Sequence, residues 1–155
     1  MIVSKIKFSN KDIENYLGGQ FSFFESLKRG GVGSIKLLYV AGIKEFDKIA
    51  ENNPAMNYCN FQLYKNGMAV LFHKKGEGFV AGIHYGEIEI IKFFSIPIKI
   101  RSNFKVKVKY QAELEIHVQD SQVKLLVPVI NYKPLKLFLH KNINPQLLDF
   151  QGQIP

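Results

Sequence analysis

The 155-residue sequence is poor in cysteine, in acidic residues and in long hydrophobic runs. Its single cysteine, Cys59, excludes an intrachain disulfide and is typical of a reducing compartment. Lysines interrupt the apolar residues at the N-terminus, so the sequence shows no signal-peptide core. The longest apolar region, residues 88–100, is interrupted by Glu89 and Lys99 and is too short to span a membrane. We therefore expect a cytoplasmic protein.

Acidic residues number 13 against 21 lysines and arginines, which gives a net charge of +8. An excess of this sign favours anionic partners such as nucleic acid or lipid headgroups, although solubilising lysines alone can also produce it. Hydrophobic residues make up 46% of the chain, which is enough to bury a core and too much for a disordered protein. Tryptophan is absent, but thirteen phenylalanines and seven tyrosines favour strands.

The first third of the chain, residues 1–55, is predicted to be a helical segment. Two short helices are expected before the glycine cluster at residues 30–33, the first of them ending at Gly18. A third helix is expected after Ser34, because apolar residues recur there at three- and four-residue spacing. A strand over residues 35–40 is the competing interpretation.

From residue 56 the pattern changes to short strands separated by tight turns. Four strands are predicted first, over residues 58–64, 68–73, 79–83 and 87–94. The first two flank Asn66-Gly67, a pair that favours the positive φ angles of a two-residue hairpin turn. Pro97 then favours an edge position or a bend.

Apolar and polar residues alternate without exception over residues 104–118. Strict alternation predicts a strand with one buried face and one solvated face, and its length predicts a bend or a break. Asp120-Ser121 can form a two-residue turn, which would place Val118 opposite Val123. This register brings the apolar residues of both strands onto one face.

The last part of the chain can be interpreted in two ways. Pro134 suits the first turn of a helix over residues 133–142, in which Leu135 and Leu139 share a face. Leu135, Leu137 and Leu139 also alternate as in a strand, but we favour the helix. Residues 144–155 are expected to be a surface tail.

Three segments of this β region carry a family resemblance. They are the strand–turn–strand at residues 63–70, the Tyr-x-x-Ile-x-x-Ile pattern that starts at Tyr85, and the hairpin and helix at residues 114–118 and 133–139. Together, over about residues 61–141, they resemble bacterial pleckstrin-homology-like domains. The resemblance implies two near-orthogonal antiparallel sheets closed at one end by a helix, in a family that mostly binds lipids or proteins.

The expected fold is therefore α+β. A helical N-terminal segment at residues 1–55 would precede an antiparallel, pleckstrin-homology-like β barrel or sandwich with a C-terminal helix at residues 56–143, and a tail would follow at residues 144–155. Phosphoinositide-binding members of the family carry several cations around the first hairpin, whereas here the turn offers only Lys65. The resemblance therefore does not imply a specific inositol-phosphate pocket.

The strongest candidate site is a basic strand face. Between residues 90 and 112 there are six cations and no acid, namely Lys92, Lys99, Arg101, Lys105, Lys107 and Lys109. Alternate residues of a strand share a face, so Lys105, Lys107 and Lys109 should project together. Beside an apolar run they would suit an anionic membrane surface. The competing interpretation is a solvated strand whose lysines prevent edge-to-edge aggregation.

Other candidates are weaker. The cations and glycines of residues 28–34 could hold a phosphate before a helix start, but a flexible connector is the simpler interpretation. Cys59 and His73 could meet across neighbouring strands as a nucleophile and a base, although a lone apolar cysteine usually is an inert buried thiol. The four histidines show no metal-binding spacing.

We therefore expect a non-catalytic binding or scaffolding module, without cofactor or metal, that recognises a protein partner or an anionic surface. Specific nucleic-acid binding is not expected. The alternative is a small-ligand carrier or small enzyme with a pocket between the sheets and the N-terminal helices, lined by Cys59, His73 or His84. Self-association could cover the phenylalanines at residues 21–24.

Overall fold

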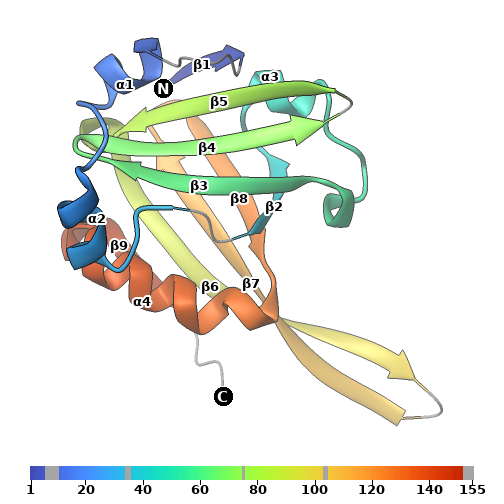
Figure 1. The fold of residues 1–155 in the computed structure, drawn as a ribbon. Helices are drawn as coiled ribbons and strands as arrows, with labels where there is room; N and C mark the ends of the chain where they lie inside the picture. The colour runs from blue at the N-terminus through green and yellow to red at the C-terminus, as the bar shows by residue number, and fades with distance from the viewer. Residues whose placement is uncertain (6–10, 34–35, 75, 103–104, 152–155) are drawn as a thin grey trace.

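The computed structural model describes residues 1–5, 11–33, 36–74, 76–102 and 105–151, and for residues 4 and 96–111 it describes the backbone alone. The chain is an α+β protein with a nine-stranded, mostly antiparallel sheet and a C-terminal helix (Figure 1). The strands are β1 (Ile2–Lys5), β2 (Leu37–Ala41), β3 (Tyr58–Tyr64), β4 (Gly67–Lys74), β5 (Glu77–His84), β6 (Ile88–Ser102), β7 (Lys105–Val118), β8 (Ser121–Val127) and β9 (Leu148–Gln151). The α-helices are α1 (Lys11–Tyr16), α2 (Phe23–Arg29), α3 (Lys44–Asp47) and α4 (Tyr132–Asn142), and the 3₁₀ turns are η1 (Pro54–Met56), η2 (Tyr85–Glu87), η3 (Val129–Asn131) and η4 (Pro145–Leu147).

The sheet consists of two antiparallel meanders joined through one short strand. Its order is β1-β5-β4-β3-β2-β8-β7-β6-β9, so β2 lies between the meander β3–β5 and the meander β6–β8. The strands of the two meanders run in different directions in Figure 1. Side chains from both meanders, such as Phe61 and Val70 from one and Ile116 and Leu125 from the other, form one buried core. Among the described strands, every neighbouring pair is antiparallel except β6 and β9.

Helix α4 packs its apolar face onto this core. Tyr132, Leu135 and Leu139 are buried, and the Tyr132 ring stacks on Phe93 of β6 at a centroid distance of 4.9 Å. Pro134 lies in the first turn, where its missing N–H breaks no helical hydrogen bond. The helix predicted over residues 133–142 is therefore confirmed.

The N-terminal third combines short helices with strands. Helices α1 and α2 are present, and α1 packs Ile13 and Leu17 on the outer face of the meander β3–β5. The predicted third helix is wrong, because residues 37–41 form β2, which is the alternative that the sequence left open. Strand β2 pairs with both β3 and β8. These strands, distant in the sequence, supply the backbone hydrogen bonds that the local pattern had assigned to a helix.

Tyr39 of β2 fixes how the chain continues into α3. Its hydroxyl oxygen accepts a hydrogen bond from the N–H of Ile43 at 2.7 Å, and its O–H donates to Oδ1 of Asp47 at 2.5 Å. The Tyr39 ring packs against the buried rings of Phe46 and Phe72. A buried tyrosine with a fully bonded hydroxyl thus anchors a helix of only four residues.

The hairpin between β7 and β8 has a different register from the predicted one. Val118 lies opposite Ser121 and Ile116 opposite Val123, so the two-residue turn is Gln119-Asp120 and the pairing is displaced by two residues. A displacement by two keeps every side chain on its face, and the apolar residues still reach the core.

The long strands and the C-terminal residues also differ from expectation. Of the predicted bend or break in β7, the break is absent, because β7 is continuous. Strand β6 is longer than predicted and continues through Pro97, where β7 is its single neighbour in the described sheet, in agreement with the edge position predicted for this proline. This edge position tolerates proline. Residues 148–151, expected in a surface tail, form β9 and pair in parallel with β6. Within the described residues, no helix is long and apolar enough to cross a membrane.

Candidate functional site

The distal part of the β6–β7 hairpin leaves the body of the sheet. The ladder between β6 and β9 ends at Phe94, and the ladder between β7 and β8 ends at Ala112. Beyond these positions the described strands pair with each other alone, up to Ser102 and Lys105. Figure 1 shows this pair of strands projecting from the rest of the molecule. We call residues 96–102 and 105–111 the basic ribbon.

Positive charge is distributed along the outer five rungs of the basic ribbon. Each of its outermost rungs pairs one cation with an uncharged residue: Ile98 with Lys109, Lys99 with Val108, Ile100 with Lys107, Arg101 with Val106, and Ser102 with Lys105. No cation therefore stands directly opposite another in the register of these rungs. The side chains of residues 96–111 lie outside the described part of the structure, so the common face of Lys105, Lys107 and Lys109 stays a prediction.

Lys92 belongs to a different environment from the other five predicted site residues. It lies in the body of the sheet, and its Cα partners are Glu115 of β7 and Asp149 of β9. Cross-strand neighbours share a face, so two carboxylates flank the position of Lys92. The sequence could not show this, because both acids come from segments far along the chain.

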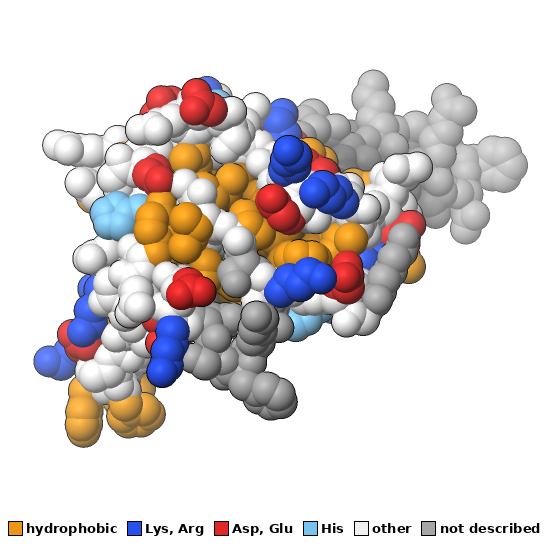
Figure 2. Space-filling view, turned by 90° about the horizontal axis from the view of Figure 1, so that it is seen from above, with side chains coloured by type: hydrophobic (Ala, Val, Ile, Leu, Met, Phe, Trp, Pro, Cys, Tyr) orange, Lys and Arg blue, Asp and Glu red, His pale blue; other side chains and the backbone are white. Residues whose placement is uncertain are grey.

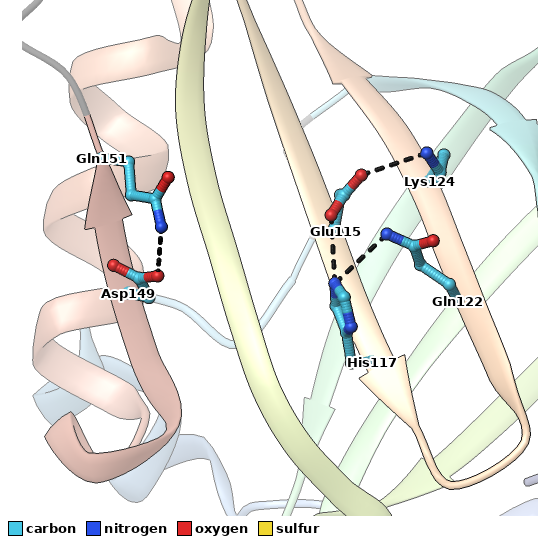
Figure 3. A network of polar contacts seen from close by, with 6 residues as sticks. All are labelled: Glu115, His117, Gln122, Lys124, Asp149 and Gln151. Carbon is cyan, nitrogen blue, oxygen red and sulfur yellow. Dashed lines mark hydrogen bonds and ion pairs between the residues drawn. The ribbon is translucent and has the colours of Figure 1, made fainter.

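The outer face of β7 and β8 carries a polar network (Figure 3). Oε2 of Glu115 lies 3.0 Å from Nε2 of His117, and Oε1 of Glu115 lies 3.1 Å from Nζ of Lys124. The amide nitrogen of Gln122 lies 3.2 Å from the same histidine nitrogen. Burial raises the pKa of Glu115, but the hydrogen bonds to His117 and Lys124 outweigh it and hold the pKa below its ordinary value. The two-residue difference in register creates this network, because it places Glu115 opposite Lys124.

Replacing Glu115 with glutamine should lower the free energy of unfolding by about 1–3 kcal/mol at neutral pH. The folded pKa is lower than the unfolded one, so the carboxylate stabilises the fold above the unfolded pKa and ceases to do so as the pH falls through the folded pKa. Urea unfolding of both proteins at about pH 7 and about pH 3 should show the difference shrinking in acid. A larger difference in acid would contradict this assignment.

Glu113 offers a matched control on the same strand. Burial raises the pKa of its carboxyl group, and the nearby Lys124 opposes this shift only in part. A raised pKa means that ionised Glu113 destabilises the fold above its folded pKa. Glu113→Gln should therefore leave stability at neutral pH unchanged or increase it.

The structure separates the candidate catalytic residues. Cys59 is 2% exposed and faces the core opposite Phe72, whereas the next residue of β4, His73, is exposed on the other face of the sheet. Burial raises the pKa of the Cys59 thiol to about 12, so it remains protonated at neutral pH. Cys59 and His73 therefore do not form a nucleophile–base pair. Among the described residues no group of three or more His, Cys, Asp or Glu side chains could hold a metal ion.

Helix α2 exposes its apolar side chains. Phe23, Phe24 and Leu27 are 75%, 74% and 67% exposed, and hydrophobic side chains stand out at this end of the molecule in Figure 2. Phe21 is the exception, because it is partly buried against the core and carries the guanidinium group of Arg29 on its ring at 4.0 Å. None of the described side chains of α2 is buried, and its apolar residues Phe23, Phe24 and Leu27 form an exposed apolar surface.

Two cavities lie beside the end of α4, one against α2 and the other against η2 and η4. Their volumes are about 360 and 440 Å³, and Asn142 lines both. Neither is lined by Cys59, His73 or His84. Sequence reasoning singled out Lys28 and Arg29 of the first cavity as part of the glycine loop, but it missed their neighbours, which come from α4.

Comparison of the chain with protein-family models, with curated proteins and with solved structures finds no match.

Proposed function

We propose that this protein is a non-catalytic binding module whose basic ribbon attaches it to an anionic membrane surface. The observation that carries the proposal is the backbone geometry of β6 and β7. Their distal residues leave the sheet, pair with each other alone among the described strands, and bear five cations and no acid in the sequence. A two-stranded ribbon without further support is marginally stable in water, so a partner surface would stabilise it.

The composition of the ribbon favours a bilayer over other polyanions. The rungs that hold the cations also hold Ile98, Ile100, Val106 and Val108. Isoleucine and valine gain nothing from a phosphate backbone, whereas at a lipid interface apolar residues enter the headgroup region and lysines bind the anionic headgroups. A ribbon that carries both kinds of residue along its length therefore suits a membrane surface better than a nucleic acid.

We also propose that the sheet and α4 form a pleckstrin-homology-like domain. In support, the segments that carry the resemblance fall on the β3–β4 hairpin, the junction of β5 with β6, the β7–β8 hairpin and α4. Two antiparallel meanders that run in different directions within one sheet, followed by a helix packed on their shared core, also support this proposal. Strands β1 and β9 would then be additions at the two edges of the sheet.

Co-sedimentation with vesicles tests the membrane proposal. We expect binding to vesicles that contain phosphatidylglycerol, weak binding to pure phosphatidylcholine, and loss of binding at high salt. Each lysine near an anionic surface contributes about 1 kcal/mol, so reversing Lys105, Lys107 and Lys109 to glutamate should lower the partition coefficient by about 100-fold or more.

A control variant separates a local effect from one of net charge. Lys11, Lys44 and Lys48 are exposed and lie in α1, in α3 or at its end, at the top of Figure 1 and away from the ribbon. Reversing these three to glutamate gives the same net charge as the ribbon variant and should change the partition coefficient much less. Equal losses in both variants, or equal binding to anionic and neutral vesicles, would refute the proposal.

A further inference from the structure

Two cavities adjoin at Asn142, which lines both, and we call them together the groove; α2 and the end of α4 line one, and η2, Asn142 and the segment from Asn144 to η4 line the other. One half is lined by Glu25, Lys28, Arg29 and Lys141, and the other by Tyr85, Gly86, Asn144 and Leu147. Each half falls within the size range of small-molecule sites. In Figure 1, α2 lies at the left and the basic ribbon at the lower right, so the groove is separate from the proposed membrane surface.

Three cations converge on the first half of the groove. Lys28 and Arg29 belong to the last turn of α2, and Lys141 comes from the last turn of α4. Nζ of Lys141 lies 3.4 Å from the point where a Cβ atom on Gly30, the C-cap of α2, would lie. The carbonyl end of α2 attracts cations and so offsets part of their mutual repulsion. Among the described residues, neither Lys28 nor Lys141 forms an ion pair.

Glu25, the one acid among the described residues that line this half, forms hydrogen bonds at the start of α2. The carboxylate of Glu25 accepts a hydrogen bond from the backbone N–H of Ser22 at 2.8 Å, and the Ser22 hydroxyl accepts one from the backbone N–H of Glu25 at 3.3 Å. These two bonds form the capping box that begins α2. Glu25 also interacts electrostatically with Arg29, but it is one acid against three cations, so this half keeps an excess positive charge.

Arg29 is held in place before any ligand arrives. Its guanidinium group stacks on the Phe21 ring, and Nη1 donates a hydrogen bond to Oδ1 of Asn142 at 3.3 Å. Asn142 is fixed in turn, because its amide donates to the carbonyl oxygen of Phe138 at 2.9 Å. A guanidinium group has five N–H donors, so Arg29 retains donors for an oxyanion. Preorganisation of this kind lowers the cost of binding.

The second half of the groove is neutral and partly apolar. No described residue forms a hydrogen bond with the Tyr85 hydroxyl, and burial raises its pKa to about 12, so it remains a donor at neutral pH. Asn144 offers its side-chain amide, and Leu147 offers an apolar wall. The groove thus combines a cationic end with a neutral end that has a free hydroxyl.

We infer that this groove binds a phosphate monoester, with the phosphate between Lys28, Arg29 and Lys141 and the rest of the molecule toward Tyr85 and Leu147. Phosphate geometry suits a fixed guanidinium flanked by two ammonium groups. The ester could be a soluble metabolite or the headgroup of a lipid, since both present the same chemistry to the groove. This inference does not depend on the proposed role of the basic ribbon.

Calorimetric titration tests the inference with two probes, glycerol 3-phosphate and monomeric dihexanoyl phosphatidic acid. We expect at least one to bind with a millimolar or lower dissociation constant, and the tighter probe identifies the soluble or the lipid source. The double variant Lys28→Gln, Lys141→Gln should weaken binding by at least about tenfold. Both lysines lie on the surface, so an unchanged thermal transition should accompany the loss.

Two further variants complete the test. Lys133→Gln removes one positive charge, half of what the double variant removes, from the first turn of α4, outside the groove, and should leave both affinities unchanged. The ribbon variant with glutamate at residues 105, 107 and 109 should also bind the soluble probe as the parent does, so failure of one proposal leaves the other standing. Absence of binding by both probes, or equal losses in Lys133→Gln and the double variant, would overturn the inference.

Discussion

Replacing Gly42 with alanine should lower the free energy of unfolding by about 3–5 kcal/mol. Gly42 adopts a φ of +108°, in the left-handed region that L-residues avoid. A Cβ atom at this position would overlap the carbonyl group of Gln122 and lie 2.9 Å from the Cα of Val123. Both are backbone atoms of β8, so no side chain can move aside, and β2 would have to separate from β8.

Gly31 separates backbone strain from steric overlap. Its φ is +97°, but an added Cβ atom would meet no heavy atom within 4 Å. Gly31→Ala should therefore cost only the strain of the left-handed conformation, about 1–2 kcal/mol. Denaturant unfolding of both variants provides the comparison. Equal losses would show that the approach of β2 to β8 contributes nothing beyond strain.

Truncation of Phe72 to alanine should cost about 3–5 kcal/mol. Phe72 is fully buried at the centre of an aromatic cluster, with ring centroids 5.4 Å from Tyr39 and 5.2 Å from Phe46. Its removal leaves a cavity and deprives both neighbouring rings of a packing partner. Natural proteins are stable by about 5–15 kcal/mol, so this one change removes a large share of the total.

Phe23 is the matched control for Phe72. The same truncation at Phe23, which is 75% exposed, deletes the same atoms from a surface position and should change stability by no more than about 0.5 kcal/mol. Thermal unfolding should therefore show a midpoint roughly 10 °C lower for Phe72→Ala and almost unchanged for Phe23→Ala. A comparable loss at Phe23 would mean that α2 is covered in solution, for example by a second copy of the chain.

Local signals predicted where the hairpins lie, but not their registers. Asn66-Gly67 indicated the turn between β3 and β4, although Gly67 already pairs with Tyr64 and the two turn residues are Lys65 and Asn66. The alternation over residues 104–118 indicated β7. The elements that the sequence did not predict depend on pairing with strands that are distant in the sequence. Strand β2 was predicted as a helix because its partners lie in β3 and β8, and β9 was missed because its four residues gain their structure from β6.

The candidate sites show the same limit. The cations of the basic ribbon can be recognised in the sequence because β6 and β7 are consecutive, but the sequence does not distinguish Lys92 from them, because its acidic neighbours Glu115 and Asp149 come from other strands. Lys28 and Arg29 were recognised as cations beside a glycine loop. Lys141, which lines the same cavity, belongs to α4, more than 100 residues further along the chain. No sequence pattern connects it with Lys28 and Arg29.

The narrow connection through β2 also gives the protein a built-in reporter. On one side β2 pairs with β3 at only two described positions, Leu37 with Cys59 and Leu38 with Tyr58. When this seam between the two meanders opens, the lone thiol of the chain loses its cover and becomes reactive toward alkylating reagents. The rate of labelling at Cys59 therefore measures how often the two meanders part while each remains intact.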